Sequence, residues 1–329
     1  MVASVKNKQE KPLNIEGTKL PPKAGGGNYF SSPKTDIQFI PSGCKILDLA
    51  LGGGGWARRR IANIIGNFSS GKSLLVIEAS TNFVLSEKKG IVRYRESESA
   101  FDREYAKALG FPLDKVDFGD PMDTVEDLFE DLEKVIKGAK GPELYIIDSL
   151  DALSDRAEMG RAMDEGSYGA AKAKMMSQLF RRTTSQMADK DITLIVVSQI
   201  RDKIGVTYGK KTTRSGGRAL DFYASQALWL TKVDKITKEI DKNKYVVGIE
   251  VEGVVEKNKI GSPHRKAVFP ILFGFGIDDH AACRDYWKSM TGEIVKKDLP
   301  LAELHRMVEE HWWEVQRRLL PTESKYGAK

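Results

Sequence analysis

The chain has 329 residues, of which 41% are hydrophobic and 30% charged, and its formal net charge is +6. This is the composition of an ordinary globular protein. The sequence has no apolar run long enough for a membrane span or a signal peptide, so we expect a cytoplasmic protein. The positive charge suits a polyanionic partner and a solvated lysine-rich surface equally well. The two cysteines and four histidines show no metal-ligand spacing, which indicates a reducing compartment and argues against zinc.

Residues 1–36 are predicted to form a basic segment without stable structure, because lysine, proline and glycine are frequent and large apolar residues are few. The segment is either a plain leader, which we favour, or a basic arm that contacts nucleic acid or a neighbouring subunit. An ordered core is expected over 37–279, beginning with a helix that Ser42 caps and that ends at Leu51. A small helical region is expected over 280–329.

Strands and helices alternate between residues 60 and 199. The apolar spacing predicts strands at 60–65, 91–96, 116–118, 143–149 and 192–199, and helices at 72–86, 100–109, 123–137 and 169–188. This alternation predicts right-handed crossovers and a parallel sheet. After Ser225 the pattern changes to short strands at 228–230, 247–251 and 266–273, which indicate an antiparallel extension. The predicted fold class is therefore α/β, with a mostly parallel central sheet.

Residues 66–73 match the spacing G-x-x-x-x-G-K-[ST], in which backbone N–H groups surround the phosphates of a nucleoside triphosphate. The loop lies between a predicted strand and a predicted helix, so the positive end of the helix faces the phosphates. Lys72 is expected to reach the β- and γ-phosphates, and Ser73 to ligate Mg²⁺. The expected nucleotide-binding residues here are Gly66, Ser69, Ser70, Gly71, Lys72 and Ser73.

Three further strands end in polar residues at the same edge of the predicted sheet. Asp148 follows a run of apolar residues and is expected to hold Mg²⁺ together with Ser73. Glu96 and Glu98 follow one another at a second strand end, and spacing alone does not decide which of them activates water. Gln199 ends the third strand, where its amide is expected to sense the γ-phosphate. The sequence therefore predicts a hydrolytic site and not only a phosphate-binding loop.

With these motifs in place, the chain resembles the RecA family of bacterial and phage strand-exchange recombinases over about residues 40–277. The resemblance rests on an ordered series of short matches, at residues 69–73, 98–102, 105–110, 147–149, 175–178, 199–206, 216–217, 222–225 and 257–260. It implies a P-loop NTPase core of the RecA type. It also selects Glu98, and not Glu96, as the catalytic glutamate, and it implies that Asp102 and Tyr105 contact adenine.

The same resemblance implies a site that two subunits share. Gln199 matches the residue that couples the γ-phosphate to a DNA-binding loop, and Lys257 and Lys259 match lysines that reach the ATP of a neighbouring subunit. Cations supplied in this way act like an arginine finger, since they stabilise the transition state only in the assembled protein. From the residues alone, we would favour a solvated hairpin face for both lysines, since such a face also alternates charge.

Two segments resemble the DNA-binding loops of the family, at residues 158–169 and 200–217. The second combines glycine with basic residues, which suits a segment that becomes ordered on a phosphate backbone and reads no sequence. The expected DNA-binding residues are Arg201, Lys203, Gly205, Lys210, Lys211, Arg214, Gly216 and Gly217. One departure from the family pattern falls inside the phosphate loop, where Asn67-Phe68 replaces the usual Pro-Glu.

Together with the ATP and Mg²⁺ site, the resemblance implies a DNA-dependent ATPase that assembles as a helical filament of identical subunits on single-stranded DNA. Its expected activity is homologous pairing with duplex DNA and strand exchange in recombination and repair. The alternatives are a ring-forming motor of the same fold, such as a helicase, and a mediator that binds DNA and ATP without exchanging strands. A nucleotide kinase is disfavoured, because no arginine cluster for an acceptor phosphate is evident.

Overall fold

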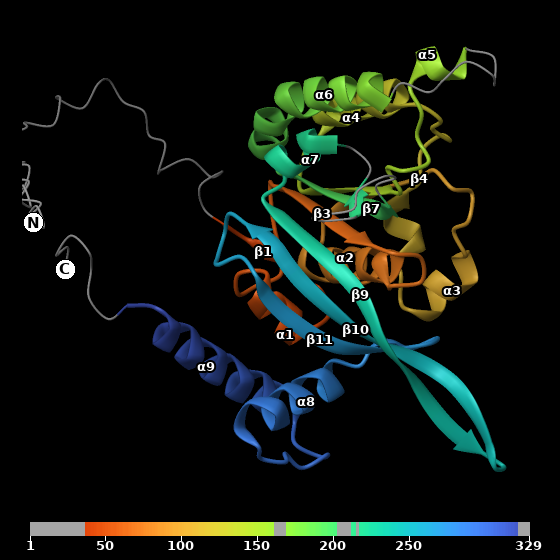
Figure 1. Cartoon of the computed structure of the whole chain (residues 1–329). Coiled ribbons are helices and arrows are strands. Elements are labelled where there is room, and N and C mark those ends of the chain that lie inside the picture. Colours follow the sequence, from red (N-terminus) through yellow and green to blue (C-terminus); the bar gives the residue numbers. More distant parts are fainter. Residues whose placement is uncertain (1–36, 161–168, 203–211, 215–216, 322–329) are drawn as a thin grey trace, which may run out of the picture. The chain divides into compact units, whose positions relative to one another are not determined.

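The computed structural model describes residues 37–160, 169–202, 212–214 and 217–321 (Figure 1). The compact unit that holds all the elements below begins at Ile37. The predictions for residues 1–36 lie outside the described residues. No helix in the described ranges is long and apolar enough to span a membrane.

A large mixed sheet organises the fold, with strand order β12-β11-β10-β9-β3-β7-β6-β4-β5. Neighbouring strands are parallel from β9 to β5 and antiparallel from β9 to β12. The predicted α/β class, with a mostly parallel sheet and an antiparallel extension, is therefore confirmed. The strands are β3 (Ile61–Gly66), β4 (Ile91–Glu96), β5 (Val116–Asp117), β6 (Glu143–Asp148), β7 (Ile192–Asp202), β9 (Gln226–Ile240), β10 (Asn243–Asn258), β11 (Arg265–Leu272) and β12 (Gly276–Ile277).

Three short strands complete the set. β1 (Phe39–Ile40) and β2 (Trp56–Ala57) form a separate antiparallel pair. β8 (Thr212–Arg214) pairs with the end of β7 in the antiparallel direction. A strand therefore stands inside the segment 200–217, which the sequence indicated only as a loop.

Helices cover both faces of the sheet (Figure 1). They are α1 (Lys45–Ala50), α2 (Lys72–Ser86), α3 (Arg103–Ala108), α4 (Val125–Gly138), α5 (Arg156–Met159), α6 (Gly169–Asp189), α7 (Gly217–Tyr223), α8 (Asp279–Thr291) and α9 (Leu301–Leu319), with a 3₁₀ turn at Leu113–Lys115. One core lies beneath α1 and α2, and a second lies beneath α4, α6 and α7. Alternate residues of each central strand face the two cores, which explains the continuous apolar runs in the sequence.

The predicted cap of the first helix is wrong. Cys44 occupies the N-cap of α1 and makes no side-chain capping bond. The Ser42 hydroxyl instead donates to the Cys44 carbonyl at 3.2 Å, and the Ser42 N–H donates to the Asp48 carboxylate at 2.8 Å. Serine here closes the turn that precedes the helix, which is a common alternative to capping.

The antiparallel extension differs from the short strands that we predicted. β9 and β10 form a long hairpin that projects away from the helical layers (Figure 1). Beyond Leu230 most residues of β9 are exposed, and many of them are charged. Without a buried face, this part of the hairpin carries no hydrophobic periodicity, so the sequence pattern did not indicate its length.

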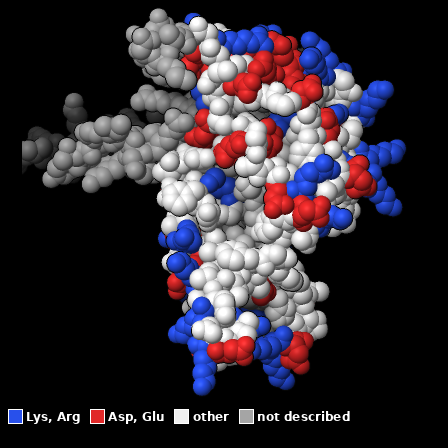
Figure 2. Space-filling model, turned by 90° about the vertical axis from the view of Figure 1, so that its right-hand side faces the viewer, with Lys and Arg blue, Asp and Glu red and all other residues white. Residues whose placement is uncertain are grey.

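The helical C-terminal region is confirmed as helical. α8 and α9 pack against α1 and contribute to the core beneath it, where Leu304, Val308 and Trp312 are buried. On the face shown in Figure 2, acidic and basic side chains are interspersed. The positive net charge therefore does not gather into one basic surface on this side of the molecule.

Candidate nucleotide and DNA site

The phosphate loop lies between β3 and α2, as predicted. Gly71 stands at the N-cap of α2 with a φ of +90°, which favours glycine. The Lys72 ammonium donates to the Asn67 carbonyl at 2.7 Å, and the Ser70 hydroxyl donates to the same oxygen at 2.8 Å. The loop is thus folded around its own lysine at the positive end of α2, which is the arrangement that fits a phosphate group. The Phe68 ring is 86% exposed on this loop.

Acidic groups converge on the loop lysine. Burial lowers the pKa of Lys72, while three nearby carboxylates oppose this shift, those of Asp148, Glu98 and Asp151. Burial also raises the pKa of Asp148, and hydroxyl groups oppose that shift, since Tyr94 donates to Asp148 at 2.7 Å and Ser73 interacts with it. Carboxylate and hydroxyl oxygens are ligands that Mg²⁺ prefers. Ser73 and Asp148 therefore fit the cation that accompanies a nucleoside triphosphate.

Glu96 has a role in the backbone of the site. Its carboxylate accepts hydrogen bonds from three consecutive N–H groups, those of Glu98 at 3.1 Å, Ser99 at 2.7 Å and Ala100 at 3.0 Å. These bonds fix the loop that follows β4. A carboxylate engaged in this way is a poor candidate for a base, because the three N–H donors already occupy its oxygens.

Glu98, in contrast, is exposed and turned toward the ends of the neighbouring strands. Its Oε1 accepts a hydrogen bond from the Gln199 amide at 3.0 Å and another from the Ser149 hydroxyl. The Gln199 backbone N–H donates to Asp151 at 2.6 Å, which fixes the position of the glutamine. The fold therefore brings together the two residues that sequence reasoning assigned to catalysis and to γ-phosphate sensing.

Sequence reasoning missed several groups at this site, namely Tyr94, Ser149 and Asp151. Tyr94 lies on β4 between Arg93 and Arg95 and is buried, and a buried aromatic side chain on a strand is an ordinary core residue. For Ser149 and Asp151, the only feature of the sequence that could have indicated a place in the site is their position just after the strand that ends in Asp148. Their roles depend on partners from other strands, so spacing along the chain did not indicate them.

A cavity of about 180 Å³ extends from this cluster toward α3. Its lining includes Ser73, Ile77, Glu98, Phe101, Asp102, Tyr105 and Asp148. Asp102 caps α3 and accepts the Tyr105 N–H at 2.9 Å, while Tyr105 is 37% exposed. The cavity thus joins Ser73, at the end of the phosphate loop, to the predicted adenine-binding residues Asp102 and Tyr105.

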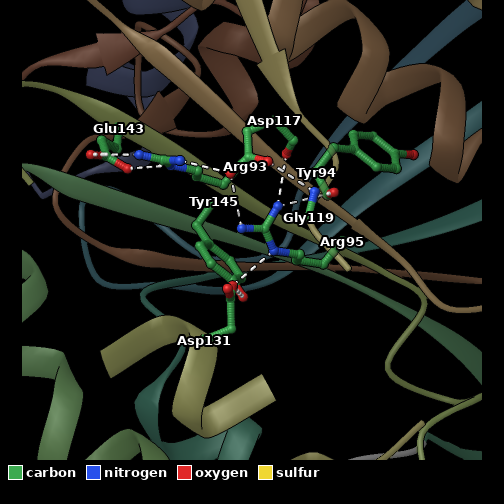
Figure 3. Close-up of polar contacts among 8 residues, drawn as sticks. All are labelled: Arg93, Tyr94, Arg95, Asp117, Gly119, Asp131, Glu143 and Tyr145. Carbon is green, nitrogen blue, oxygen red and sulfur yellow. Dashed lines mark hydrogen bonds and ion pairs between the residues drawn. The ribbon is translucent and has the colours of Figure 1, made fainter. Parts of the chain in front are cut away.

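A network of arginines braces the sheet edge that carries the glutamates (Figure 3). Arg95 on β4 bonds Asp131 of α4 at 2.8 Å and the carbonyl of Asp117 at 2.7 Å. Arg93 bonds Asp117 at 2.6 Å and Glu143 of β6 at 2.8 Å. Arg95 directly precedes Glu96, so the network fixes the strand end from which the loop to Glu98 begins.

Lys257, on β10, and Lys259, directly after that strand, both contact helix α7. Lys257 donates to the carbonyls of Asp221 and Phe222, at 3.0 Å for Phe222, and Lys259 donates to the Phe222 carbonyl at 3.3 Å. The Lys259 ammonium also lies 5.9 Å from the centre of the Phe222 ring, which is 71% exposed. The single chain therefore places both lysines at the last turn of α7, and not on its own phosphate loop.

The described residues include only parts of the two predicted DNA loops. Arg201 lies on β7, Arg214 on β8, and Gly217 begins α7. Lys203, Gly205, Lys210, Lys211 and Gly216 lie outside the described residues, as do residues 161–168 of the first loop. β7 carries Gln199 and continues to Asp202, so the candidate nucleotide site and the second loop share one strand.

This phosphate loop, with an acidic residue at the end of β6 and a glutamine on the adjacent parallel strand β7, defines a P-loop nucleoside triphosphatase. A family model described as the RecA N-terminal domain matches residues 27–278. The chain therefore belongs to the RecA family. This membership makes it a DNA-dependent ATPase and a recombinase of DNA recombination and repair.

Several similar proteins carry the name Protein RecA. The one from Clavibacter michiganensis is 35% identical over 292 residues, which cover 88% of this chain and 78% of the relative. The one from Treponema denticola is 34% identical, covering 90% and 70% respectively. The one from Streptomyces avermitilis is 37% identical, covering 82% and 70%.

Proposed function

We propose that this chain hydrolyses ATP at the cavity between α2 and α3, with Glu98 as the general base. The observation that carries the proposal is the hydrogen bond from Gln199 to Glu98, because it joins the water-activating group to the strand that leads to a DNA loop. Lys72 and the N–H groups of residues 66–73 would bind the phosphates, and Asp102 and Tyr105 the adenine. Ser73 and Asp148 would hold Mg²⁺, which would supply positive charge beside the phosphate oxygens.

Glu98 is suited to orient and deprotonate a water molecule. It is exposed, while Glu96 holds the surrounding loop in place. The Gln199 and Ser149 donors orient the Glu98 carboxylate toward the strand ends. A general base of this kind contributes about 10²- to 10⁴-fold to the rate.

Gln199 is the proposed link between nucleotide and DNA. A change in its side-chain partner, from Glu98 to a γ-phosphate, would act on β7 and on the segment that follows Asp202. By linkage, ATP should then raise DNA affinity by the same factor by which DNA raises ATP affinity. The eight predicted DNA-binding residues would contact the phosphate backbone, and affinity should fall with salt.

The proposed assembly is a helical filament in which each site is completed by Lys257 and Lys259 of the next subunit. Both lysines lie beside the exposed Phe222 on α7, so an exposed cationic and aromatic surface is available to a second copy. Single-stranded DNA would bind along the filament, and homologous duplex DNA would pair with it. We place this activity in the cytoplasm of a bacterial cell or of a phage-infected host.

A strand-exchange assay tests the proposal directly. Full-length protein, ATP, Mg²⁺ and single-stranded DNA should convert a homologous duplex, and a heterologous duplex of equal length should not react. A mediator would bind DNA and hydrolyse ATP without exchange. Electron microscopy with a slowly hydrolysed ATP analogue should show filaments, and closed rings would favour a helicase-like motor instead.

A further inference from the structure

The fold brings together metal-ligating side chains that are scattered in the sequence. Cys44 precedes α1, Cys283 lies on α8 and His305 lies on α9, and these three helices pack against one another. Both cysteine side chains are buried, and they are the only two in the chain. The sequence argued against zinc because none of these residues are neighbours along the chain.

Three of the side chains form a compact cluster. The ligand atoms of Asp279, Cys283 and His305 all lie within 4.8 Å of one another. Nε2 of His305 is 2.6 Å from Oδ2 of Asp279, and Sγ of Cys283 is 3.7 Å from Oδ1. Tetrahedral bonds of about 2.0 to 2.3 Å hold neighbouring ligand atoms roughly 3.3 to 3.8 Å apart. Small side-chain movements would therefore accommodate a tetrahedral ion.

The surroundings of the cluster resemble those of a supported metal site. The Lys45 backbone N–H donates to Oδ1 of Asp279 at 2.7 Å, so one carboxylate oxygen is held while the other faces His305. Outer hydrogen bonds of this kind orient carboxylate ligands in known sites. Cys44 is close enough to interact electrostatically with both Asp279 and Cys283.

We propose that Asp279, Cys283 and His305 bind one Zn²⁺ ion, which fastens α9 to α8. A thiolate, an imidazole and a carboxylate suit zinc, whereas Mg²⁺ prefers oxygen ligands alone. Binding would release the Cys283 thiol proton to solvent, without any redox change. All three ligands follow residue 278, where the match to the family model ends, so the site would be a feature of this chain's C-terminal region.

Direct binding measurements test the proposal. Full-length protein without an affinity tag would be treated with a chelator under reducing conditions and titrated with Zn²⁺ in excess Mg²⁺, which would compete for the proposed Mg²⁺ site at Ser73 and Asp148. We expect about one equivalent to remain after desalting. Co²⁺ in place of Zn²⁺ should give the absorption of a tetrahedral thiolate site. At a free Zn²⁺ concentration of 100 Kd, Tm should rise by roughly 5 °C.

Variants make the result specific. Cys283→Ser should remove the thiolate absorption, and His305→Gln should weaken binding by at least about tenfold. The matched control is His311→Gln on the same helix, where the imidazole pairs with Tyr286, and its binding should equal that of the parent. Circular dichroism would verify that each variant is folded. Failure of the parent protein to retain the ion, or equal binding in all three variants, would overturn the proposal and leave the cluster as a set of ordinary hydrogen bonds.

Discussion

The side-chain amide of Gln199 donates to Oε1 of Glu98 at 3.0 Å, although 101 residues separate the two in the chain. Gln199 lies on β7 and Glu98 follows β4. These two strands lie on either side of β6, so their carboxyl ends reach the same edge of the sheet. This bond gives a physical basis for the proposed coupling, because it joins the group that would activate water to the strand that leads to the proposed DNA-binding segment.

Replacing the phosphate-loop lysine should abolish turnover. Lys72→Ala removes the buried cation on which three carboxylates converge, and we expect ATP hydrolysis to fall by at least about 10²-fold. Steady-state release of phosphate in the presence of single-stranded DNA measures the effect. Lys88→Ala, an exposed lysine after α2, is the control. Unchanged turnover in Lys72→Ala would exclude the proposed site.

The two glutamates should differ in the kind of defect they produce. Glu98→Gln should still bind ATP and form stable filaments, but hydrolyse about 10²- to 10⁴-fold more slowly. Glu96→Gln keeps oxygen acceptors for some of the three N–H donors, so its kcat should remain closer to that of the parent. Single-turnover hydrolysis and nucleotide binding separate the two outcomes. A slower reaction in Glu96→Gln than in Glu98→Gln would reverse the assignment.

Loss of the Gln199 side chain should uncouple ATP binding from DNA binding. Gln199→Ala removes the donor to Glu98, so ATP should no longer raise DNA affinity, while nucleotide binding persists. Fluorescence anisotropy of labelled single-stranded DNA, with and without an ATP analogue, reports the coupling. Gln186→Ala on α6 serves as the control, since the Gln186 amide donates to the Arg182 carbonyl of the same helix. Coupling that survives in Gln199→Ala would assign the link to another residue.

Sharing of the site between subunits can be tested by mixing variants. Lys257→Ala and Lys72→Ala should each be inactive alone. In random filaments of an equal mixture, roughly a quarter of the interfaces should regain activity, because they combine an intact Lys72 with an intact Lys257 from the neighbour. In the single chain both lysines donate to the Phe222 carbonyl at the end of α7. They can act on a neighbouring subunit only if assembly breaks these hydrogen bonds. Inactive mixtures, in filaments shown to contain both proteins, would contradict sharing.

One buried carboxyl should make stability depend on pH. Burial raises the pKa of Asp48 from 3.8 to about 7. Between these values the native state holds a proton that the unfolded chain has lost, so stability should fall as pH rises from 4 to 7, by up to about 1.4 kcal/mol per unit. Asp48→Asn should flatten this dependence, and Asp298→Asn, at an exposed position, should not.

Urea unfolding at pH 5 and pH 8, with a chelator present, measures that difference. The asparagine retains an oxygen that accepts the Ser42 N–H, so the native turn should persist. Parallel pH profiles for the parent and Asp48→Asn would show that another group carries the dependence.

The sequence by itself determined the phosphate loop, the alternation of strands and helices, and the polar residues at three strand ends. These features are local: a glycine-rich loop needs a fixed spacing, and buried parallel strands need continuous apolar runs. The length of the β9–β10 hairpin was not predictable, because its exposed part has no buried face to set a pattern. The cap at Ser42 was mispredicted, since a serine before a helix has more than one backbone group to bind.

Only the tertiary structure decided which residues meet. Glu98 and Glu96 are indistinguishable by spacing, and the resemblance to the family supplied the choice between them. The three N–H bonds to Glu96 and the Gln199 bond to Glu98 now give a physical reason for it. Likewise, Cys283 and His305 carry no metal signature in the sequence, and they become neighbours only because α8 and α9 pack together. Contacts of this kind depend on sheet order and helix packing, which the one-dimensional pattern does not contain.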